Sequence, residues 1–458
     1  MRTVIAILVA KAALKLNRLS GSGGTALPGL VAQKLDADIL AKLTLRNFPS
    51  GIIVVTGTNG KTTTTRLIAN VLDEAGISYV HNRTGSNLER GLVASVVGSA
   101  SLRGRVDADV GLFEVDEAYI PRVCRAVKPK MVVVTNLFRD QLDRYGELDK
   151  IARSFRDVFD ELAQTQLVLN ADDPLVASLG FNLENERKIT YFGVGDFVGN
   201  KLNNDRTADS VFDPFTQEKL YYTQQYFGHI GKYRSKNSDF TRPKVDYEAQ
   251  DLKQKGIEGI SFVVNKTTKP IKLGLPGIFN VYNSIAAYAV SKSFFDLDEQ
   301  QIVAGITSST AAFGRSERLY YQDREILMLL VKNPTGLNQM IQTYLLNEPD
   351  RLLVFVINDN FADGRDVSWL WDAALEDLKS YKGKIIASGS RAYDMALRLK
   401  YAGITDVLVV PNSKELLGVI SQQTTRRSKV FVLPTYTAML GLRSSLVAED
   451  DKLQEYWQ

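Results

Sequence analysis

The sequence predicts an α/β protein with parallel, doubly wound sheets. Apolar runs typical of buried strands alternate with stretches of helical periodicity, and this alternation indicates parallel sheets. A glycine-rich turn, residues 56–64, joins the first strand to the first helix, and a second alternating series starts after Phe313. We therefore expect an N-terminal helical segment over residues 1–45, a central domain over 46–307 and a C-terminal domain over 308–458.

The strands of the first series are expected in five apolar runs: GIIVVTG, ISYVHN, DVGLFEV, KMVVVTN and QLVLN. Helices between them are expected in TTTTRLIANVLDEAG and LDKIARSFRDVFDEL. Residues 201–251 are polar and tyrosine-rich, which indicates an insertion before the helix NSIAAYAVSKSFFDL. The second series holds the expected helix SRAYDMALRLKYAG and the expected strands EILMLLV, RLLVFVIN, KIIASG, DVLVVP and KVFVLP.

Length and composition are those of an ordinary globular protein. The 458 residues are 45% hydrophobic and 24% charged, and the net charge of +4 is too small to indicate nucleic acid as a partner. The single cysteine, Cys124, excludes an internal disulfide and fits a reducing compartment.

The N-terminal stretch combines apolar and basic residues at helical spacing. Its apolar run, residues 4–10, is interrupted by Lys11 and is too short to span a bilayer, which takes about 20 apolar residues. Lys11, Lys15 and Arg18 fall on one face of a helix. Such a helix suits a membrane surface with anionic lipid, but we favour a helix docked on its own domain.

The turn TGTNGKTTT has the chemistry of a phosphate-binding loop. Its cofactor-binding residues are expected to be Gly57, Thr58, Asn59, Gly60, Lys61, Thr62 and Thr63. Backbone N–H groups would cradle phosphates, Lys61 would reach the outer phosphates, and Thr62 would offer a hydroxyl to magnesium. The common pattern has a further glycine where Val55 stands, so this loop is a shorter variant.

This loop and later stretches resemble the Mur ligase superfamily, enzymes that activate a carboxylate as an acyl phosphate and join it to an amine. The matching stretches are GSNL (85–88), FEVDEA (113–118), TNLFRDQLDRYG (135–146), LNADDP (169–174), GIFNVYNSIAAYA (277–289), FGRSE (313–317) and KNP (332–334). The resemblance implies a Mur ligase-like central P-loop ATPase domain with a small inserted ribbon, a Rossmann-like α/β C-terminal domain, and ATP and Mg²⁺ as cofactors. Gln141 stands where these ligases usually have histidine, so a second metal position is in doubt.

The resemblance also implies roles for single residues. Glu114, at the end of a strand that faces the loop, would hold magnesium together with Thr62. Asn87, Asn280 and Asn283 would bind adenine or fix its pocket, although each could instead be a cap or turn residue. Arg315 would reach phosphate or ribose.

Within the superfamily the chain resembles the MurT family, the synthetase subunits of lipid II isoglutaminyl synthases. This resemblance rests on YIPR (119–122), FRDQLDRYGE (138–147) and ADGRDVSW (362–369), and only residues 1–45 precede the central domain, so no separate uridine-nucleotide domain is expected. It implies that ATP phosphorylates the α-carboxylate of D-glutamate in the stem peptide of lipid II. Ammonia from a separate glutaminase subunit, GatD, would then amidate it.

A complete glutaminase site within this chain is not expected. Such a site needs a nucleophilic cysteine with a base, and Cys124 has no motif around it. The only histidines are His81 and His229, and we expect no catalytic role for His229. The glutaminase must therefore be a second polypeptide.

The inserted segment of MurT proteins often carries a zinc ribbon with two C-x-x-C pairs. Here the four ligand positions fall on Asp213, Thr216, Ser235 and Ser238, a poor tetrahedral zinc set, so we expect no zinc. Packing must then hold the ribbon, and the candidate core residues are Tyr221, Tyr222, Tyr226, Phe227 and Tyr233.

The stretch VINDNFADGRDVSWLWD, residues 356–372, carries four carboxylates after a buried strand. One interpretation is a magnesium site, although Arg365 puts a cation among the acids. Another is local structure: Asp363 would form a turn, and Asp366 or Ser368 would cap a helix WLWDAALEDL.

The MurT resemblance implies a third interpretation, in which Asp366 completes a Cys-His-Asp triad whose other members lie on GatD. A carboxylate can orient a histidine that belongs to another chain. We favour this role for Asp366, since loops after parallel strands present functional groups. Asp359 and Asp372 are expected to face solvent or cap neighbouring segments.

The sequence therefore predicts an ATP-dependent carbon–nitrogen ligase with Lys61, Glu114 and Asp366 as catalytic residues. Two alternatives stay open: an amino-acid-adding ligase such as a folylpolyglutamate synthase, and a regulatory ATP-binding subunit without catalysis, for which Gln141 would argue. The expected partners are GatD, in a heterodimer, and lipid II at the inner membrane surface. The expected location is cytoplasmic, either free or peripheral at the plasma membrane.

Overall fold

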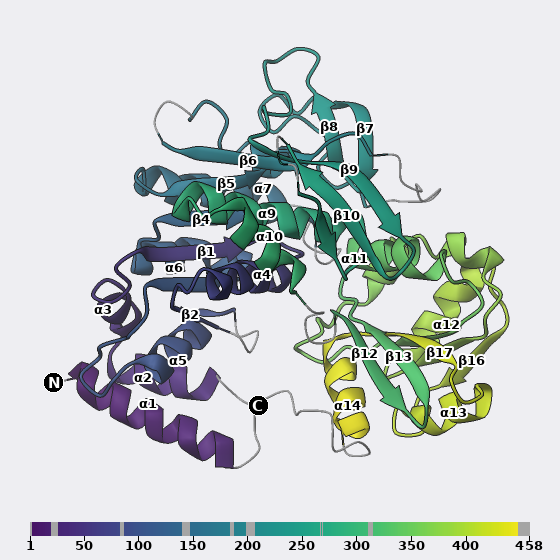
Figure 1. The fold of residues 1–458 in the computed structure, drawn as a ribbon. Helices are drawn as coiled ribbons and strands as arrows, with labels where there is room; N and C mark the ends of the chain where they lie inside the picture. The colour runs from purple at the N-terminus through teal and green to yellow at the C-terminus, as the bar shows by residue number, and fades with distance from the viewer. Residues whose placement is uncertain are drawn as a thin grey trace.

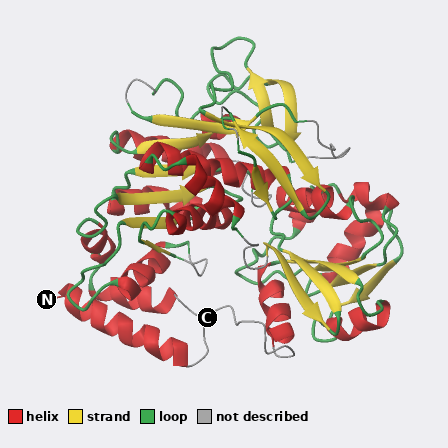
Figure 2. Cartoon of the chain, viewed as in Figure 1, coloured by secondary structure: helices red, strands yellow, loops and turns green. Residues whose placement is uncertain are grey.

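The computed structural model contains two large sheets, each covered by helices, and a small two-stranded sheet (Figures 1 and 2). It describes residues 2–19, 26–82, 87–139, 147–183, 187–197, 207–265, 267, 269–309 and 315–447. Within these residues one sheet has nine strands in the order β11-β10-β9-β6-β5-β4-β1-β3-β2, and the other has six in the order β12-β13-β17-β14-β15-β16. The predicted α/β class is confirmed. The domain division proposed at residue 308 would separate the two sheets.

The first sheet is parallel at its centre. Its parallel strands are β1 (Gly51–Thr56), β2 (Tyr79–His81), β3 (Val110–Glu114), β4 (Met131–Val134), β5 (Gln166–Asn170) and β6 (Ile189–Val194). β9 (Tyr247–Lys255) pairs in parallel with β6, and β10 (Gly259–Val264) and β11 (Ile271–Leu273) follow it in antiparallel pairing. Neither β6 nor these last three strands were predicted from the sequence; β9 escaped because it is largely polar and mostly exposed beyond Ala249.

Helices cover both faces of this sheet, so its central strands are buried on both sides. Alternate residues of β1 enter two hydrophobic clusters: Ile52 and Val54 join one, and Ile53 and Val55 join the other. The cluster with Ile53 is completed by α4 (Lys61–Glu74), α9 (Ile278–Phe295) and α10 (Glu299–Thr307). The cluster with Ile52 is completed by α3 (Ile39–Thr44), α5 (Glu89–Ser99), α6 (Ile120–Val127), α7 (Glu147–Glu161) and α8 (Pro174–Ala177).

The N-terminal residues form a helical pair, α1 (Arg2–Leu19) and α2 (Ala26–Leu35), at one end of the molecule (Figure 1). α1 buries Ala6, Ile7 and Ala10 in the cluster that contains Ile52, so the predicted docking on its own domain is confirmed. Among the described residues, no helix has the length and apolar character needed to span a bilayer.

The insertion contains a two-stranded sheet, β7 (Tyr221–Phe227) and β8 (Ile230–Arg234). Tyr226, Phe227 and Tyr233 are buried as predicted. Tyr221 was wrongly expected in the core: it is 47% exposed, because it lies at the outer end of β7 with the guanidinium of Arg234 over its ring.

A carboxylate occupies the place where a zinc ribbon would hold its metal. Asp213 is buried, and its Oδ1 accepts hydrogen bonds from the backbone N–H groups of Phe215 and Thr216 at 2.8 and 3.2 Å. Its Oδ2 accepts a hydrogen bond from the hydroxyl of Ser238. Asp213, Thr216 and Ser238, three of the four degenerate ligand positions, are thus joined by hydrogen bonds in addition to aromatic packing.

The C-terminal sheet begins with the antiparallel pair β12 (Arg315–Tyr321) and β13 (Arg324–Leu329). Its parallel strands are β14 (Leu352–Val356), β15 (Ile385–Ser388), β16 (Val407–Val410) and β17 (Lys429–Pro434). Its helices are α11 (Pro334–Met340), continued by a π-helical turn (Ile341–Leu345), then α12 (Ala392–Tyr401), α13 (Leu416–Gln423) and α14 (Tyr436–Val447).

The local-structure interpretation placed a continuous helix in WLWDAALEDL, and this helix does not form. The chain instead forms two 3-10 turns, Ser368–Trp371 and Leu375–Ser380. Between them, side chains from neighbouring helices take the backbone groups that a continuous helix would use: Asn338 accepts from Ala374 N at 2.8 Å, and Arg398 donates to the carbonyls of Leu370 and Ala373.

Candidate functional site

The predicted phosphate loop runs from the end of β1 to the start of α4. Gly57 and Gly60 have φ of +127° and +87°, a region that favours glycine. A Cβ on Gly60 would lie 2.1 Å from Asn283 Oδ1, and one on Gly57 would lie 2.2 Å from Thr135 Oγ1. Since α4 begins at Lys61, the positive end of the helix faces the loop.

Residues that follow β4 hold this loop in place. Asn136 accepts a hydrogen bond from Asn59 N and donates one to Asn59 O, both at 2.9 Å, and its carbonyl accepts from Thr58 N. Thr135 Oγ1 also donates to Asn59 O at 2.8 Å. The sequence analysis gave Asn136 no role, although its place in the matched TNLF stretch was a usable signal.

Lys61 is buried among acidic side chains. Its Nζ lies 2.8 Å from Glu117 Oε2 and also donates to Gly57 O. Burial by itself lowers the pKa of Lys61, but the charges of Glu117, Asp116 and Glu114 outweigh it and raise the pKa above the ordinary value, so the ammonium stays charged. Glu117 was not predicted, although it belongs to the FEVDEA stretch.

Thr62 and Glu114 lie side by side at the mouth of the loop. The Thr62 hydroxyl donates to Glu114 Oε1 at 3.0 Å. Asn82, at the end of β2, fixes the backbone of Glu114 through two hydrogen bonds, at 2.8 and 2.9 Å. A hydroxyl and a carboxylate are oxygen ligands of the kind that Mg²⁺ prefers, so these residues fit the ion. No group of three or more His, Cys, Asp or Glu side chains that could hold a metal occurs in the described parts of the chain.

The asparagines of α9 contact the phosphate loop from behind. Asn283 accepts from Thr64 Oγ1 at 3.3 Å and donates to Asn280 Oδ1, and Asn280 donates to Pro276 O at 2.8 Å. Asn283 thus contacts the end of the phosphate-loop motif and Asn280 contacts Asn283, while their role toward adenine stays a prediction. Asn87 accepts through its carbonyl from Asp116 N.

Three sequence predictions concern positions that the structure leaves partly or wholly undescribed. Arg315 begins β12, but its side chain lies outside the described residues, as do Gln141 and the first half of the GSNL stretch.

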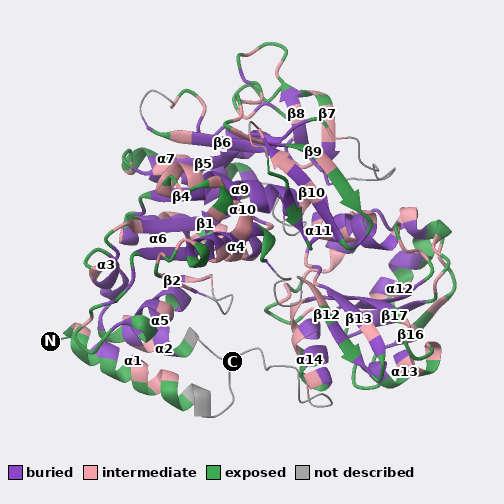
Figure 3. Cartoon of the chain, viewed as in Figure 1, coloured by how far each residue is buried: buried purple, intermediate pink, exposed green. Residues whose placement is uncertain are grey.

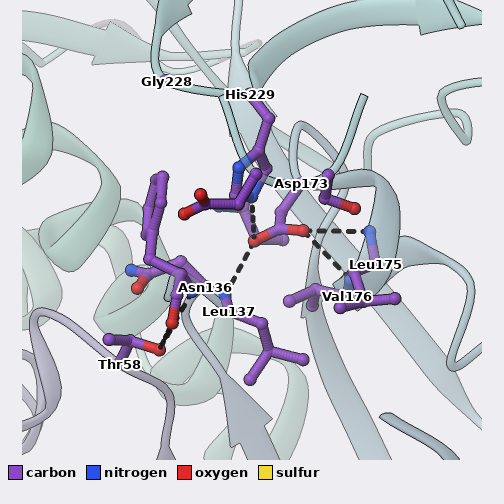
Figure 4. Close-up of polar contacts among 12 residues, drawn as sticks. Thr58, Asn136, Leu137, Asp173, Leu175, Val176, Gly228 and His229 are labelled. Atoms are coloured by element: carbon purple, nitrogen blue, oxygen red, sulfur yellow. Dashed lines mark hydrogen bonds and ion pairs between the residues drawn. The ribbon is translucent and has the colours of Figure 1, made fainter. Parts of the chain in front are cut away.

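The turn between β7 and β8, with Gly228 and His229, lies above Thr58 of the loop in Figure 4, with Asp173 between them. Asp173 accepts from the N–H groups of Leu137, Leu175 and Val176, and its Oδ2 lies 3.4 Å from His229 Nε2. The ring of His229 lies 4.4 Å from that of Phe138, which in turn exchanges two hydrogen bonds with Thr58. The imidazole is fully buried between the Asp173 carboxylate and the ring of Phe138, and the expectation that His229 has no catalytic role stays a prediction.

Two polar contacts join the central and C-terminal sheets beside the loop. Asn333, which caps α11, donates to Asn59 Oδ1 at 3.1 Å. Arg139 is 3% exposed and pairs with both Asp209 and Asp372. The expectation that Asp372 faces solvent or caps a neighbour is therefore wrong, because this carboxylate forms an ion pair with an arginine of the central domain.

Asp366 lies in the long loop that follows β14, on the C-terminal sheet. Its Oδ1 accepts from the backbone N–H of Ser368 at 2.8 Å and from the Ser368 hydroxyl. Asp363 is anchored more firmly, since it accepts from Thr437 N at 2.6 Å and from Asn360 N. Asp359 accepts from Ser390 Oγ at 2.9 Å. The structure thus brings Lys61, Thr62 and Glu114 together and places Asp366 on a separate, half-exposed loop.

Cys124 is buried inside α6. Loss of hydration raises the pKa of its thiol to about 12, so the thiolate needed for nucleophilic attack does not form near neutral pH.

Comparisons with known proteins agree with the geometry. The family model described as the Mur ligase middle domain matches residues 55–237, and the one described as MurT ligase C-terminal matches residues 330–439. The subunit MurT of lipid II isoglutaminyl synthase (glutamine-hydrolyzing) from Staphylococcus aureus (strain COL) is 32% identical over 448 residues, which cover 97% of this chain and 98% of that protein. Its Streptococcus pneumoniae (strain R6) counterpart is 32% identical over 452 residues, 98% of each chain.

Solved structures share the fold. A pseudomurein peptide ligase type C from Methanothermus fervidus superposes with a TM-score of 0.69 at 21% identity, over 90% of this chain and 81% of that one. Folylpolyglutamate synthase from Mycobacterium tuberculosis, solved with ADP and AMPPCP, superposes with a TM-score of 0.58 at 15% identity, over 98% of this chain and 96% of that one.

Proposed function

This chain belongs to the MurT family, and we propose from that membership and from its site that it is the synthetase subunit of a lipid II isoglutaminyl synthase. As a Mur ligase relative it is an ATP-dependent carbon–nitrogen ligase of cell-wall synthesis. The proposed reaction is amidation of the α-carboxylate of D-glutamate in the stem peptide of lipid II, with ammonia from a GatD-like glutaminase.

The reaction divides into two balanced steps. A carboxylate oxygen attacks the γ-phosphorus of ATP, ADP leaves, and an acyl phosphate forms. The lone pair of ammonia then attacks the acyl carbon, phosphate leaves, and the nitrogen gives up a proton. Most of the catalysis in such transfers is positioning and charge stabilisation.

The observation that carries this proposal is the charged cluster at the phosphate loop. A buried Lys61 ammonium lies at the positive end of α4, and the Thr62 hydroxyl and Glu114 carboxylate meet 3.0 Å apart beside it. Lys61 would lie against the outer phosphates of ATP, and Thr62 and Glu114 would hold magnesium. When bound, that ion neutralises charge on the transferring phosphoryl group.

The glutaminase part of the proposal assigns Asp366 to the partner's histidine. The half-exposed carboxylate is held by Ser368 in a loop at the carboxyl end of a parallel strand. Such a group can select the tautomer of a histidine that approaches from another chain. Because lipid II is a membrane lipid, the proposed place of action is the inner face of the plasma membrane.

The experiment supplies lipid II, ATP and ammonium chloride to the purified chain with its partner, and follows ADP release and the amidated product by mass spectrometry. Equal amounts of ADP and isoglutaminyl product are expected. A subunit that only binds ATP would release no ADP, and a ligase that adds an amino acid would give product only when that amino acid is present.

A further inference from the structure

Helix α1 is apolar on two faces, and only one of them is covered. Ala6, Ile7 and Ala10 are fully buried against the domain. The opposite side exposes large apolar side chains, and α2 adds more of them. These residues, which we call the α1–α2 apolar face, are Val4 (40% exposed), Ile5 (47%), Leu8 (46%), Val9 (41%), Leu16 (66%), Leu27 (53%), Leu30 (38%) and Leu35 (41%). Because α1 and α2 pack against each other, these side chains lie on adjacent helices, and such a gathering of exposed apolar side chains on a folded domain indicates a binding surface.

The segment that forms this face contains basic residues and no acidic ones. Positions 1–35 contain Arg2, Lys11, Lys15, Arg18 and Lys34, and the first acidic residue is Asp36. Asp36 does not oppose this charge at the surface, since it is buried and hydrogen-bonds Lys42 Nζ and Thr3 Oγ1, each at 2.6 Å. At 100° per residue, Lys11 borders the exposed stripe of α1 beside Val4, and Lys15 falls inside the stripe, between Val4 and Leu8.

A groove of about 650 Å³ continues the surface at the N-terminal end of α1. Val4 and Ile7 of α1 line it. Its charged lining is Lys42, Arg46, Arg103, Arg105, Asp107 and Asp109. Lys42 is paired with Asp36 at 2.6 Å, and Asp109 accepts a hydrogen bond from Ser78 Oγ but keeps its charge, so the rest of the lining has three arginines and two aspartates, a small excess of positive charge. Both helices lie at the opposite end of the central sheet from β7 and β8, and α1 presents exposed residues along its length (Figures 1 and 3).

We propose that the α1–α2 apolar face docks this protein on an anionic lipid bilayer. The apolar side chains would enter the boundary between headgroups and acyl chains, and the basic residues would face lipid phosphates. An apolar stripe bordered by Lys and Arg, in a stretch free of acidic residues, matches this surface better than a protein interface, whose core is depleted in lysine. The inference rests on the proposed function for its lipid-linked substrate, and it names the surface through which the protein would reach that substrate.

The test measures flotation of the full chain, alone and with its partner, on vesicles of phosphatidylglycerol and phosphatidylcholine in equal parts, without lipid II or ATP. Binding that weakens with salt and exceeds binding to pure phosphatidylcholine is expected. The double variant Leu8→Glu and Leu16→Glu should lose at least about tenfold in affinity. Lys15→Glu should lose about fivefold or more on the anionic vesicles.

The matched control is Leu408→Glu, a leucine of β16 that is 44% exposed against 46% for Leu8. It should bind vesicles as the wild type does. All variants should keep the melting temperature of the wild type, since each replaced side chain is exposed.

Equal vesicle binding by the double variant and the wild type would overturn the proposal. So would a concentration-dependent dimer that the double variant abolishes, because a second copy would then cover the face. Amidation separates this inference from the proposed function. The double variant should amidate lipid II in detergent micelles as the wild type does and fail on lipid II in vesicles, whereas failure of the wild type in micelles would count against the function alone.

Discussion

Two loops of this molecule each follow the carboxyl end of a buried parallel strand. They differ in how many contacts with other parts of the chain hold their functional side chains in place. The phosphate loop after β1 is bonded to residues from several elements, among them Asn136, Asn283 and Asn333. The loop after β14 presents Asp366, which is held by Ser368 only two residues away, near a Phe361 that is 89% exposed. One loop is preorganised within the chain, and the other has the character of a surface that a second protein completes.

The largest effect should come from the preorganised loop. Lys61→Met keeps the side-chain volume and removes the charge, so ATP-dependent amidation should fall by at least about 1,000-fold with either glutamine or ammonium as nitrogen source. The rate of ADP release measures this loss of activity. Lys292→Met is the control, since this lysine forms a surface ion pair with Asp296 and should change activity less than about twofold.

Stability must be separated from chemistry for that variant. Lys61→Met removes the ammonium from the largely buried ion pair with Glu117, which destabilises the fold. The double variant Lys61→Met and Glu117→Gln should recover the melting temperature and stay inactive. Recovery of activity together with stability would show that Lys61 serves the fold and not the phosphate.

The second-largest effect is expected from Asp366, in the loop after β14. Asp366→Asn, assayed with GatD, should reduce glutamine-dependent amidation by about 100-fold or more, because an amide no longer stabilises a charged histidine. Activity with ammonium should stay within about twofold, since the phosphate loop is intact. Asp359→Asn in the same loop is the control and should leave both activities unchanged. An equal loss of amidation with glutamine and with ammonium would mean that Asp366 has a structural role and does not serve the glutaminase.

Features encoded locally in the sequence could be predicted, and contacts between residues distant in the sequence could not. Motif chemistry and strand periodicity located β1, the phosphate loop and Glu114, because these signals are local in the chain. Glu117 and Asn136 lie in the matched stretches FEVDEA and TNLFRDQLDRYG, but their partners in the phosphate-loop motif are distant in sequence, so the motifs alone assigned them no role. Asn82 likewise acts on Glu114 of the neighbouring strand, 32 residues away. They lie at strand ends, where a search for polar residues could have found them.

Predictions from local sequence patterns were wrong where side chains from distant parts of the chain hydrogen-bond the backbone or pair with a charged group. The WLWDAALEDL stretch has helical periodicity, yet Asn338 and Arg398 bind its backbone groups and split it into two turns. Asp372 looked like a solvent-facing acid because its partner, Arg139, precedes it by 233 residues. Long-range ion pairs of this kind leave no signal in a single sequence.

The third prediction concerns the contact between the two regions. Asp372→Ala breaks the ion pair with Arg139 and should loosen the C-terminal domain against the phosphate loop, with a loss of about tenfold in activity with ammonium. A double-mutant cycle with Arg139→Gln should give a coupling of about 1 kcal/mol or more.

The control for this cycle is an ion pair within one domain, Arg391 with Asp394. Asp394→Ala should leave the activity unchanged. Additive effects of Arg139→Gln and Asp372→Ala would mean that the two loops work independently and that the contact is incidental.

The smallest effect should come from the ribbon, whose β7–β8 turn supports the phosphate loop and not the Asp366 loop. Asp213→Asn keeps the size of the side chain but weakens the hydrogen bonds to Phe215, Thr216 and Ser238, at a cost of about 1–3 kcal/mol to the local stability of the ribbon. Amide hydrogen exchange in β7 and β8 should quicken. Because the His229 ring lies against Phe138, which is hydrogen-bonded to Thr58, the KM for ATP should rise slightly and equally with both nitrogen sources. Added zinc, or a zinc-selective chelator that leaves magnesium in solution, should change nothing. A loss confined to glutamine would instead connect the ribbon with the partner's side of the molecule and break the distinction between the two loops.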